Sequence, residues 1–183
     1  AELAAARADA APGFAEAVAA ELQGLGMGDG EFEVELSERE PGPTGTDGVA
    51  FLVRPNPGLP FAPAAETASG GELSRIALAL RAVAHAAAGE PTVVFDEIDA
   101  GIGGRTAHAV ADALARLAAR AQILTITHLP QIASAAGAHF RVEKVPGDPT
   151  HTRIERLSES DRSEELERML GGAEFLSTVR TRS

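Results

Sequence analysis

The chain has 183 residues, about one domain, and 44% of them are hydrophobic, as in an ordinary soluble globular protein. It has no cysteine, which excludes disulfides and thiolate metal sites, and no apolar run or signal peptide that would place it in or across a membrane. A cytoplasmic location is the default expectation, and a net charge of −11 argues against a generally basic surface that wraps DNA.

The N-terminal part is predicted to hold one helix and one hairpin. Apolar residues at helical spacing predict a helix that begins at Pro12 and ends near Gly26, with residues 1–11 as a frayed helix or the stump of a longer one. Alternating apolar and acidic residues predict a strand at 31–37. Three segments follow: a loop at 38–48, a strand at 49–54 paired with the first, and an irregular, proline-rich connection at 55–68.

The middle of the chain alternates helices and short apolar strands. A helix begins near Ser69 and continues to Gly89, and the apolar run 92–96 predicts a fully buried strand. A helix at about 104–120 and a strand at 122–127 complete a parallel βαβ unit. The predicted C-terminal elements are a short helix at 130–136, a hairpin of strands 139–145 and 151–157, a helix at about 161–170, and a loose tail at 173–183.

Two adjacent carboxylates, Asp96 and Glu97, end the predicted buried strand. Ligands bind α/β sheets at the carboxyl ends of strands, and neighbouring residues there point in different directions. One acid could therefore hold Mg²⁺ through water while the other orients or deprotonates an attacking water. A capping or salt-bridged acid pair on a loop is the structural alternative.

The motif Ser69-Gly70-Gly71-Glu72 opens the next candidate site. Serine followed three residues later by glutamate is a capping box, which would explain Ser69 and Glu72 by helix capping alone. Two consecutive glycines are not needed for a cap. They remove side chains where the N–H groups of a helix start could face an anion, so this turn could also cradle a phosphate.

His128 follows the second parallel strand, and Asp99 lies in the glycine-rich segment after the acids. Two parallel strands joined by one helix would bring His128 to the same sheet edge as the acids, where it could contact a γ-phosphate. A histidine there can equally be a structural hydrogen-bonding group. Asp99 either shapes its loop or reaches across an interface.

The sequence contains no GxxxxGK[ST] phosphate loop, and its only lysine, Lys144, lies in the predicted C-terminal hairpin. A nucleotide site made by this chain alone would therefore lack the cradle for the β- and γ-phosphates.

The motifs SGGELSR, VVFDEID, a glycine loop and TITH, in this order, resemble the C-terminal half of an ABC-type ATPase head. They are similar to the signature motif, the Walker B strand, the D-loop from Asp99, and the switch histidine. The segments VRPNPG, ASGGELSR, FDEIDAGIGGRTA, THLPQIA and HFRVEK resemble the RecN family, SMC-like bacterial proteins that repair DNA double-strand breaks.

The resemblance covers about residues 12–172 and implies an α/β fold: the C-terminal lobe of an ABC/SMC-type P-loop ATPase head, with a parallel βαβ core and flanking antiparallel hairpins and helices. Residues 1–11 would be the stump of a coiled-coil helix. The implied cofactors are ATP and Mg²⁺. The implied partners are an N-terminal lobe carrying Walker A, a second head in an ATP-sandwiched dimer, and DNA held by the whole protein.

The resemblance also implies roles for the site residues. Asp96 would bind Mg²⁺ through water, Glu97 would position the hydrolytic water, and His128 would sense the γ-phosphate. The turn from Ser69 to Glu72 would bind the nucleotide of the opposite head, with Asp99 nearby. A bacterial, nucleoid-associated location follows. The alternatives are another SMC/Rad50-type or transporter-type ATPase head, or a head-pairing module without hydrolysis.

Overall fold

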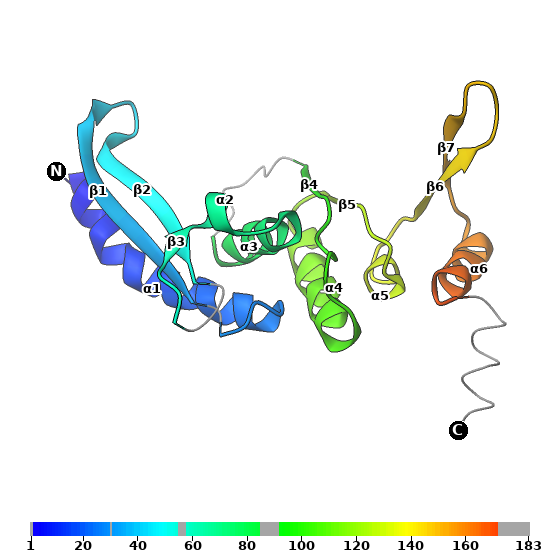
Figure 1. Ribbon diagram of the computed structural model, residues 1–183, viewed down its shortest axis with the longest axis horizontal. Coiled ribbons are helices and arrows are strands. Elements are labelled where there is room, and N and C mark those ends of the chain that lie inside the picture. The colour runs from blue at the N-terminus through cyan, green and yellow to red at the C-terminus, as the bar shows by residue number, and fades with distance from the viewer. Residues whose placement is uncertain (1, 30, 55–57, 85–91, 172–183) are drawn as a thin grey trace. The chain divides into compact units, whose positions relative to one another are not determined.

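The computed structural model describes residues 2–29, 31–54, 58–84 and 92–171 (Figure 1). The chain divides into two compact units, Ala1–Ile126 and Thr127–Ser183, and each is described by itself below. Within the described ranges, no helix combines the length and the apolar character that spanning a bilayer requires.

The first element, α1 (Glu2–Gly24), is one helix that contains Pro12 in its interior. A proline there removes a backbone hydrogen bond and costs about 3 kcal/mol in an isolated helix. The helix nevertheless continues through Pro12 and packs on the neighbouring hairpin, where Arg7 donates a hydrogen bond of 3.0 Å to Asp47. The prediction that the helix begins at Pro12 is therefore wrong, whereas a coiled-coil origin for residues 1–11 stays a prediction.

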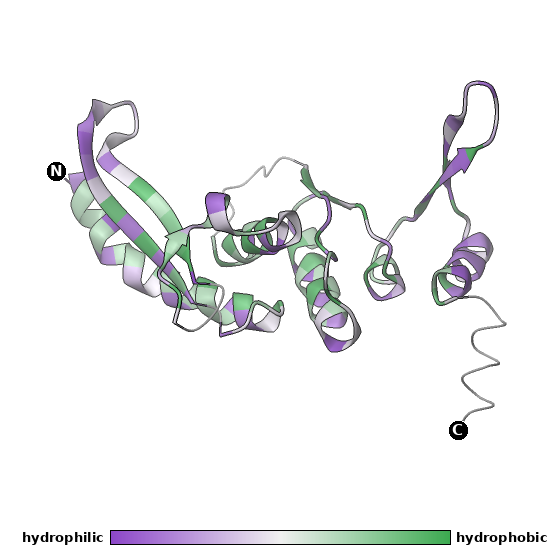
Figure 2. Cartoon of the chain, in the orientation of Figure 1, coloured by the Kyte–Doolittle hydropathy of each residue, from purple (hydrophilic) through white to green (hydrophobic). Residues whose placement is uncertain are grey.

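The hairpin of β1 (Phe32–Gly42) and β2 (Gly45–Val53) is longer than predicted. The strands are antiparallel with Phe32 opposite Val53, and the register shifts between Glu38 and Gly42. The predicted loop at 38–48 is wrong because its prolines and glycines bend and turn the distal end of the hairpin without breaking it. Figure 2 shows hydrophilic and hydrophobic bands alternating along both strands.

An aromatic and aliphatic core joins α1 to the inner face of this hairpin. The ring of Phe51 lies 6.3 Å from that of Phe14 and 5.6 Å from that of Phe32, centroid to centroid. Val18 and Leu22 of α1 are fully buried. Apolar contacts of this kind supply most of the stability of a helix packed on a sheet.

The proline-rich connection contains more regular structure than predicted. β3 (Ala62–Pro63) pairs antiparallel with β2, and the short helix α2 (Ala64–Thr67) follows it. The chain then enters the next helix through Ser69. Residues 55–57 of the predicted connection lie outside the described part of the chain.

A parallel βαβ unit follows, as predicted. Val93, Val94 and Phe95 pair in parallel register with Ile123, Leu124 and Thr125. The end of the first helix predicted at Gly89 falls outside the described residues. The elements are α3 (Gly70–Val83), β4 (Val93–Phe95), α4 (Gly104–Ala118) and β5 (Ile123–Thr125).

The strand pair β4–β5 is buried on one face only. Phe95 is 3% exposed, whereas Val94 is 62% and Leu124 is 49% exposed, and these two lie opposite each other in the register. Ile126, two residues after Leu124, is 61% exposed. The prediction of a fully buried strand is therefore wrong for this chain, because a parallel strand needs a covering layer on each face to be buried. Val94, Leu124 and Ile126 are called the strand face below.

The second unit contains the predicted C-terminal hairpin, with Val142 opposite Ile154. The side chain of Ser158 caps the last helix by accepting a hydrogen bond from the N–H of Asp161. The predicted tail at 173–183 falls outside the described residues. The elements are α5 (Pro130–Ala133), β6 (Phe140–Val145), β7 (His151–Arg156) and α6 (Glu159–Met169).

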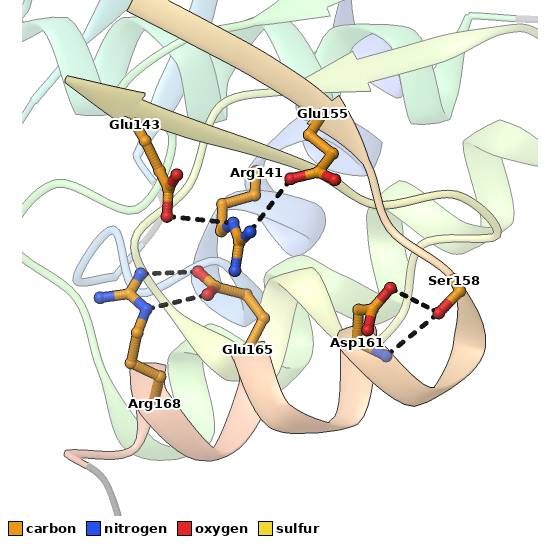
Figure 3. Close-up of polar contacts among 7 residues, drawn as sticks. All are labelled: Arg141, Glu143, Glu155, Ser158, Asp161, Glu165 and Arg168. Atoms are coloured by element: carbon orange, nitrogen blue, oxygen red, sulfur yellow. Dashed lines mark hydrogen bonds and ion pairs between the residues drawn. The ribbon is translucent and has the colours of Figure 1, made fainter. Parts of the chain in front are cut away.

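A buried carboxylate, Glu165, is paired within α6 to Arg168 and lies near Arg141 of this hairpin (Figure 3). Glu165 is 5% exposed and accepts hydrogen bonds of 2.8 and 2.6 Å from Arg168. Arg141 of β6 pairs with Glu155 at 3.0 Å and with Glu143 at 3.2 Å. The hydrogen bonds from Arg168, with the nearby charge of Arg141, lower the pKa of Glu165 below its ordinary 4.5.

Glu165→Gln is expected to destabilise the second unit by about 1–3 kcal/mol at pH 7, because it weakens a charge-assisted pair in a buried position. A lowered folded pKa means that this stabilisation is present above about pH 4.5 and is lost as the pH falls through the folded value. The difference in unfolding free energy between Glu165→Gln and the parent should therefore be smaller at pH 3 than at pH 7. Urea unfolding followed by circular dichroism measures it, since the chain has no Trp or Tyr.

The matched control is Glu167→Gln, an exposed glutamate two residues along the same helix. It should unfold like the parent at both pH values. A Glu165→Gln variant as stable as the parent at pH 7 would contradict this account of the cluster.

Candidate functional site

The segment between β4 and α4, residues 96–103, is called the acid loop. Asp96 and Glu97 are exposed at its start, and an Asp96 carboxylate oxygen accepts a hydrogen bond of 2.9 Å from the N–H of Glu97. Glu97 has a φ of +54°, a left-handed conformation that costs a non-glycine residue of order 1–3 kcal/mol. The turn gives the two carboxylates different directions, as two distinct roles would require.

The capping box predicted at the start of α3 is present. Ser69 accepts a hydrogen bond from the N–H of Glu72, whose carboxylate accepts bonds of 2.8 Å from the N–H and the hydroxyl of Ser69. The bonds from Ser69 lower the pKa of Glu72. Helix capping thus accounts for Ser69 and Glu72 in this structure, and their contact with a nucleotide stays a prediction.

The two glycines let α3 approach the acid loop closely. A Cβ on Gly71 would lie 2.9 Å from the carbonyl oxygen of Glu97 and from the Cβ of Ala100. A Cβ on Gly70 would lie 2.6 Å from a carboxylate oxygen of Glu97. The first turn of α3 and the acid pair, 25 residues apart in the sequence, therefore form one site in the first unit, with Glu97 over the positive end of the helix.

Asp99 lies deeper in the same loop and is 3% exposed. Its backbone carbonyl accepts a hydrogen bond of 3.3 Å from the N–H of Ile102. Its neighbour Ile98 is fully buried in the core and anchors the loop. This burial favours the loop-shaping alternative for Asp99 over contact across an interface.

Two residues of the SGGELSR motif, Ser74 and Arg75, contact the acid loop, a role that was not predicted from the sequence. Ser74 donates a hydrogen bond of 2.6 Å to the carbonyl of Asp96, and Arg75 donates to carbonyls farther along the acid loop. Arg75 shares a buried helix face with Gly71 and Leu78. A lone cation at a core position of an otherwise apolar helix stripe is the sequence signal that could have identified it.

His128 belongs to the second unit and is exposed. The preceding Thr127 accepts a hydrogen bond of 3.0 Å from the N–H of Leu129, which shapes the turn after β5. Because His128 and the acid pair lie in different units, the position of His128 beside the acids stays a prediction.

The donor set suits an anion and a hydrated cation. The N–H groups at the start of α3 suit a phosphate, and an exposed carboxylate on Asp96 suits Mg²⁺, which keeps several waters. Among the residues that the structure describes, no three His, Asp or Glu side chains are grouped as metal ligands. A Mg²⁺ site at the acid pair stays a prediction.

Comparison with solved structures defines the class of fold. An Smc head domain from Pyrococcus yayanosii matches with a TM-score of 0.57 over 85% of this chain and 28% of that one, at 23% identity. The head from Pyrococcus furiosus with an extended coiled coil, bound to the C-terminal domain of ScpA, matches with a TM-score of 0.56 over 85% of this chain and 37% of that one, at 22% identity. The chain therefore has the mixed α/β fold of an SMC-type ATPase head.

Comparison of sequences gives the family, although no family model matches. DNA repair protein RecN of Streptomyces coelicolor is 41% identical over 96% of this chain and 33% of its own length. RecN of Haemophilus influenzae is 41% identical over 94% of this chain and 32% of its own length. The chain is homologous to the C-terminal part of the RecN family of DNA repair proteins, and it spans about a third of the curated relatives it matches.

Proposed function

We propose that this chain is the C-terminal lobe of a RecN-type ATPase head. Together with an N-terminal lobe that carries Walker A, it hydrolyses ATP to ADP and phosphate. Binding and hydrolysis pair and release two heads, and this cycle holds DNA ends during double-strand-break repair and recombination. The observation that carries the proposal is the packing of the Ser69–Glu72 turn against Glu97 and Ala100 of the acid loop, in a chain homologous to RecN.

Each residue of the site has a role in this scheme. Asp96 would hold Mg²⁺ through water, and Mg²⁺ would supply charge neutralisation at the phosphates. Glu97 would orient the attacking water and accept its proton. His128 would donate a hydrogen bond to the γ-phosphate.

The first turn of α3 would face the nucleotide of a second head. The N–H groups after Ser69 and the bare backbone at Gly70 and Gly71 would bind its γ-phosphate, with Glu72 holding the turn by the capping box. Asp99 would support this surface by shaping the loop beneath it. A nucleotide held in this way requires two heads, so ATP-dependent pairing follows from the proposed geometry. One matching structure comes from work on the ATP-driven dimerization of SMC ATPases.

Two apolar surfaces suit an N-terminal lobe. The strand face exposes Val94, Leu124 and Ile126 on a parallel strand pair, a type of strand that is ordinarily buried on both faces. In the second unit, Val142 and Ile154 are 64% and 68% exposed on one face of the β6–β7 hairpin. Such faces are typical of a chain that folds against another layer.

The chain is acidic, with a net charge of −11, so this lobe by itself is expected to bind DNA poorly. DNA would be held through the whole protein. The bacterial origin of the RecN relatives supports the proposed cytoplasmic, nucleoid-associated location.

The test compares the purified chain with the chain plus the N-terminal lobe. Alone, it should show no Mg²⁺-dependent ATPase above background, because the sequence has no GxxxxGK[ST] loop. Adding the lobe should restore turnover of the order of 1 s⁻¹ or below, at the low end of enzymes. Substantial ATPase from the chain alone would refute the divided site, and association with the lobe without turnover would favour a head-pairing module.

A further inference from the structure

A buried cation of α3, Arg75, bonds the acid loop rather than a carboxylate. Its guanidinium donates hydrogen bonds of 3.2 Å to the carbonyl of Ile98 and 3.1 Å to the carbonyl of Ala100, and its side chain is 5% exposed. Burial lowers the pKa of Arg75, so its position is costly to the charged form. A leucine would fill a core position without that cost, whereas the arginine adds hydrogen bonds to two carbonyls.

Ser74, the preceding residue, holds the other end of the same loop. Its hydroxyl donates a hydrogen bond of 2.6 Å to the carbonyl of Asp96. The carbonyls of Asp96 and Ile98 belong to the residues on either side of Glu97 in the chain. The backbone is therefore fixed by α3 immediately before and immediately after Glu97.

The bonds from Ser74 and Arg75 matter because Glu97, which lies between them in the chain, has a strained backbone conformation. Its φ of +54° is unfavourable for a glutamate and persists only where the surroundings determine it. Gly71 allows the close approach of α3 that the bonds need, since a Cβ there would lie 2.9 Å from the Glu97 carbonyl. Without the bonds, the residue is expected to relax toward an ordinary φ and to turn its carboxylate elsewhere.

We infer that Ser74 and Arg75 are positioning residues, which hold Glu97 in the strained turn that aims its carboxylate. The inference rests on the proposed ATPase function for its catalytic consequence, but the attachment itself is a property of this chain. It also means that the turn from Ser69 to Glu72 and the acid pair move as one body. A ligand that shifts the start of α3 therefore shifts Glu97 with it.

Amide hydrogen exchange on this full chain tests the attachment without ATP. The reporters are the hydrogen-bonded amides of Ala100 and Ile102 in the acid loop. Ser74→Ala and Arg75→Lys should each raise their exchange rates by about tenfold or more, because loop opening becomes easier. Arg75 bonds both carbonyls through one terminal nitrogen, Nη1, and the lysine side chain is one bond shorter, so its ammonium would fall short of that position. Ser74→Thr keeps the hydroxyl and should restore the slow rates.

Matched controls separate this effect from general loosening. Ser163→Ala removes a helix hydroxyl that bonds a carbonyl of its own helix α6, and Arg116→Lys changes a cation whose side chain is 60% exposed. Neither should alter exchange in the acid loop. Unchanged loop exchange in both Ser74→Ala and Arg75→Lys would overturn the inference.

The second arm uses the chain combined with the N-terminal lobe. Ser74→Ala and Arg75→Lys should lower kcat by roughly tenfold to a hundredfold with KM nearly unchanged, because displacement of a catalytic group slows chemistry without weakening binding. An unchanged kcat in an active complex would overturn the catalytic part of the inference. A wild-type complex without ATPase would instead refute the proposed function, and the exchange experiment would still decide whether α3 holds the loop.

Discussion

Glu97→Gln, in the complex with the N-terminal lobe, is expected to lower ATP turnover by about 10²- to 10⁴-fold, the usual contribution of a general base. The amide keeps the size of the side chain and its hydrogen-bonding reach but cannot accept the proton of the attacking water. Binding of ATP and pairing of heads do not need that proton transfer. The variant should therefore accumulate as ATP-bound head pairs, which size-exclusion chromatography with Mg²⁺ and ATP would detect.

The control for this substitution is Glu35→Gln, which makes the same chemical change at an exposed position on β1. It should turn over ATP and dissociate after hydrolysis like the parent complex. If Glu97→Gln also turns over ATP like the parent, Glu97 is not the catalytic carboxylate. Loss of ATP-dependent pairing in Glu97→Gln would show that the carboxylate contributes to assembly as well.

The centre of the fold was predictable because its signals are local and strong. Periodic apolar residues in α3 and α4, separated by short apolar runs, define a βαβ unit whose parallel register the structure confirms. The adjacency of the acids to the end of β4 followed from chain order alone. The contact between the Ser69–Glu72 turn and the acid loop did not, because it depends on how closely α3 packs.

The errors occurred where tertiary contacts outweigh local preference. Pro12 is a helix breaker by propensity, yet α1 continues through it because Arg7 and Phe14 bind the hairpin on either side. The prolines and glycines of 38–48 signalled a loop, but cross-strand pairing extends on both sides of the turn. The bonds of Arg75 to the acid loop were not predicted, although Arg75 lies in the SGGELSR motif, because its partners are backbone carbonyls, which no side-chain motif encodes.

The error at the strand face is of a different kind. The composition of β4 and β5 is that of strands covered on both sides, whereas Val94, Leu124 and Ile126 are about half exposed or more. Full burial of such a side chain contributes roughly 1.5–3 kcal/mol, so covering the exposed part of these three would contribute about 1–2 kcal/mol each. A partner that covers the strand face therefore gains a few kcal/mol, a difference of about 100-fold or more in affinity.

Leu124→Asp is accordingly expected to weaken binding of the N-terminal lobe by at least about 100-fold, because an unpaired carboxylate would be buried at the interface. Leu124 is already half exposed in this chain, so the melting curve of the isolated chain should change little. Leu59→Asp is the matched control, a leucine of similar exposure (50%) that lies outside the strand face. Calorimetric titration of the lobe into each variant measures the difference. Equal affinity for Leu124→Asp and the parent would place the N-terminal lobe on another surface of the chain.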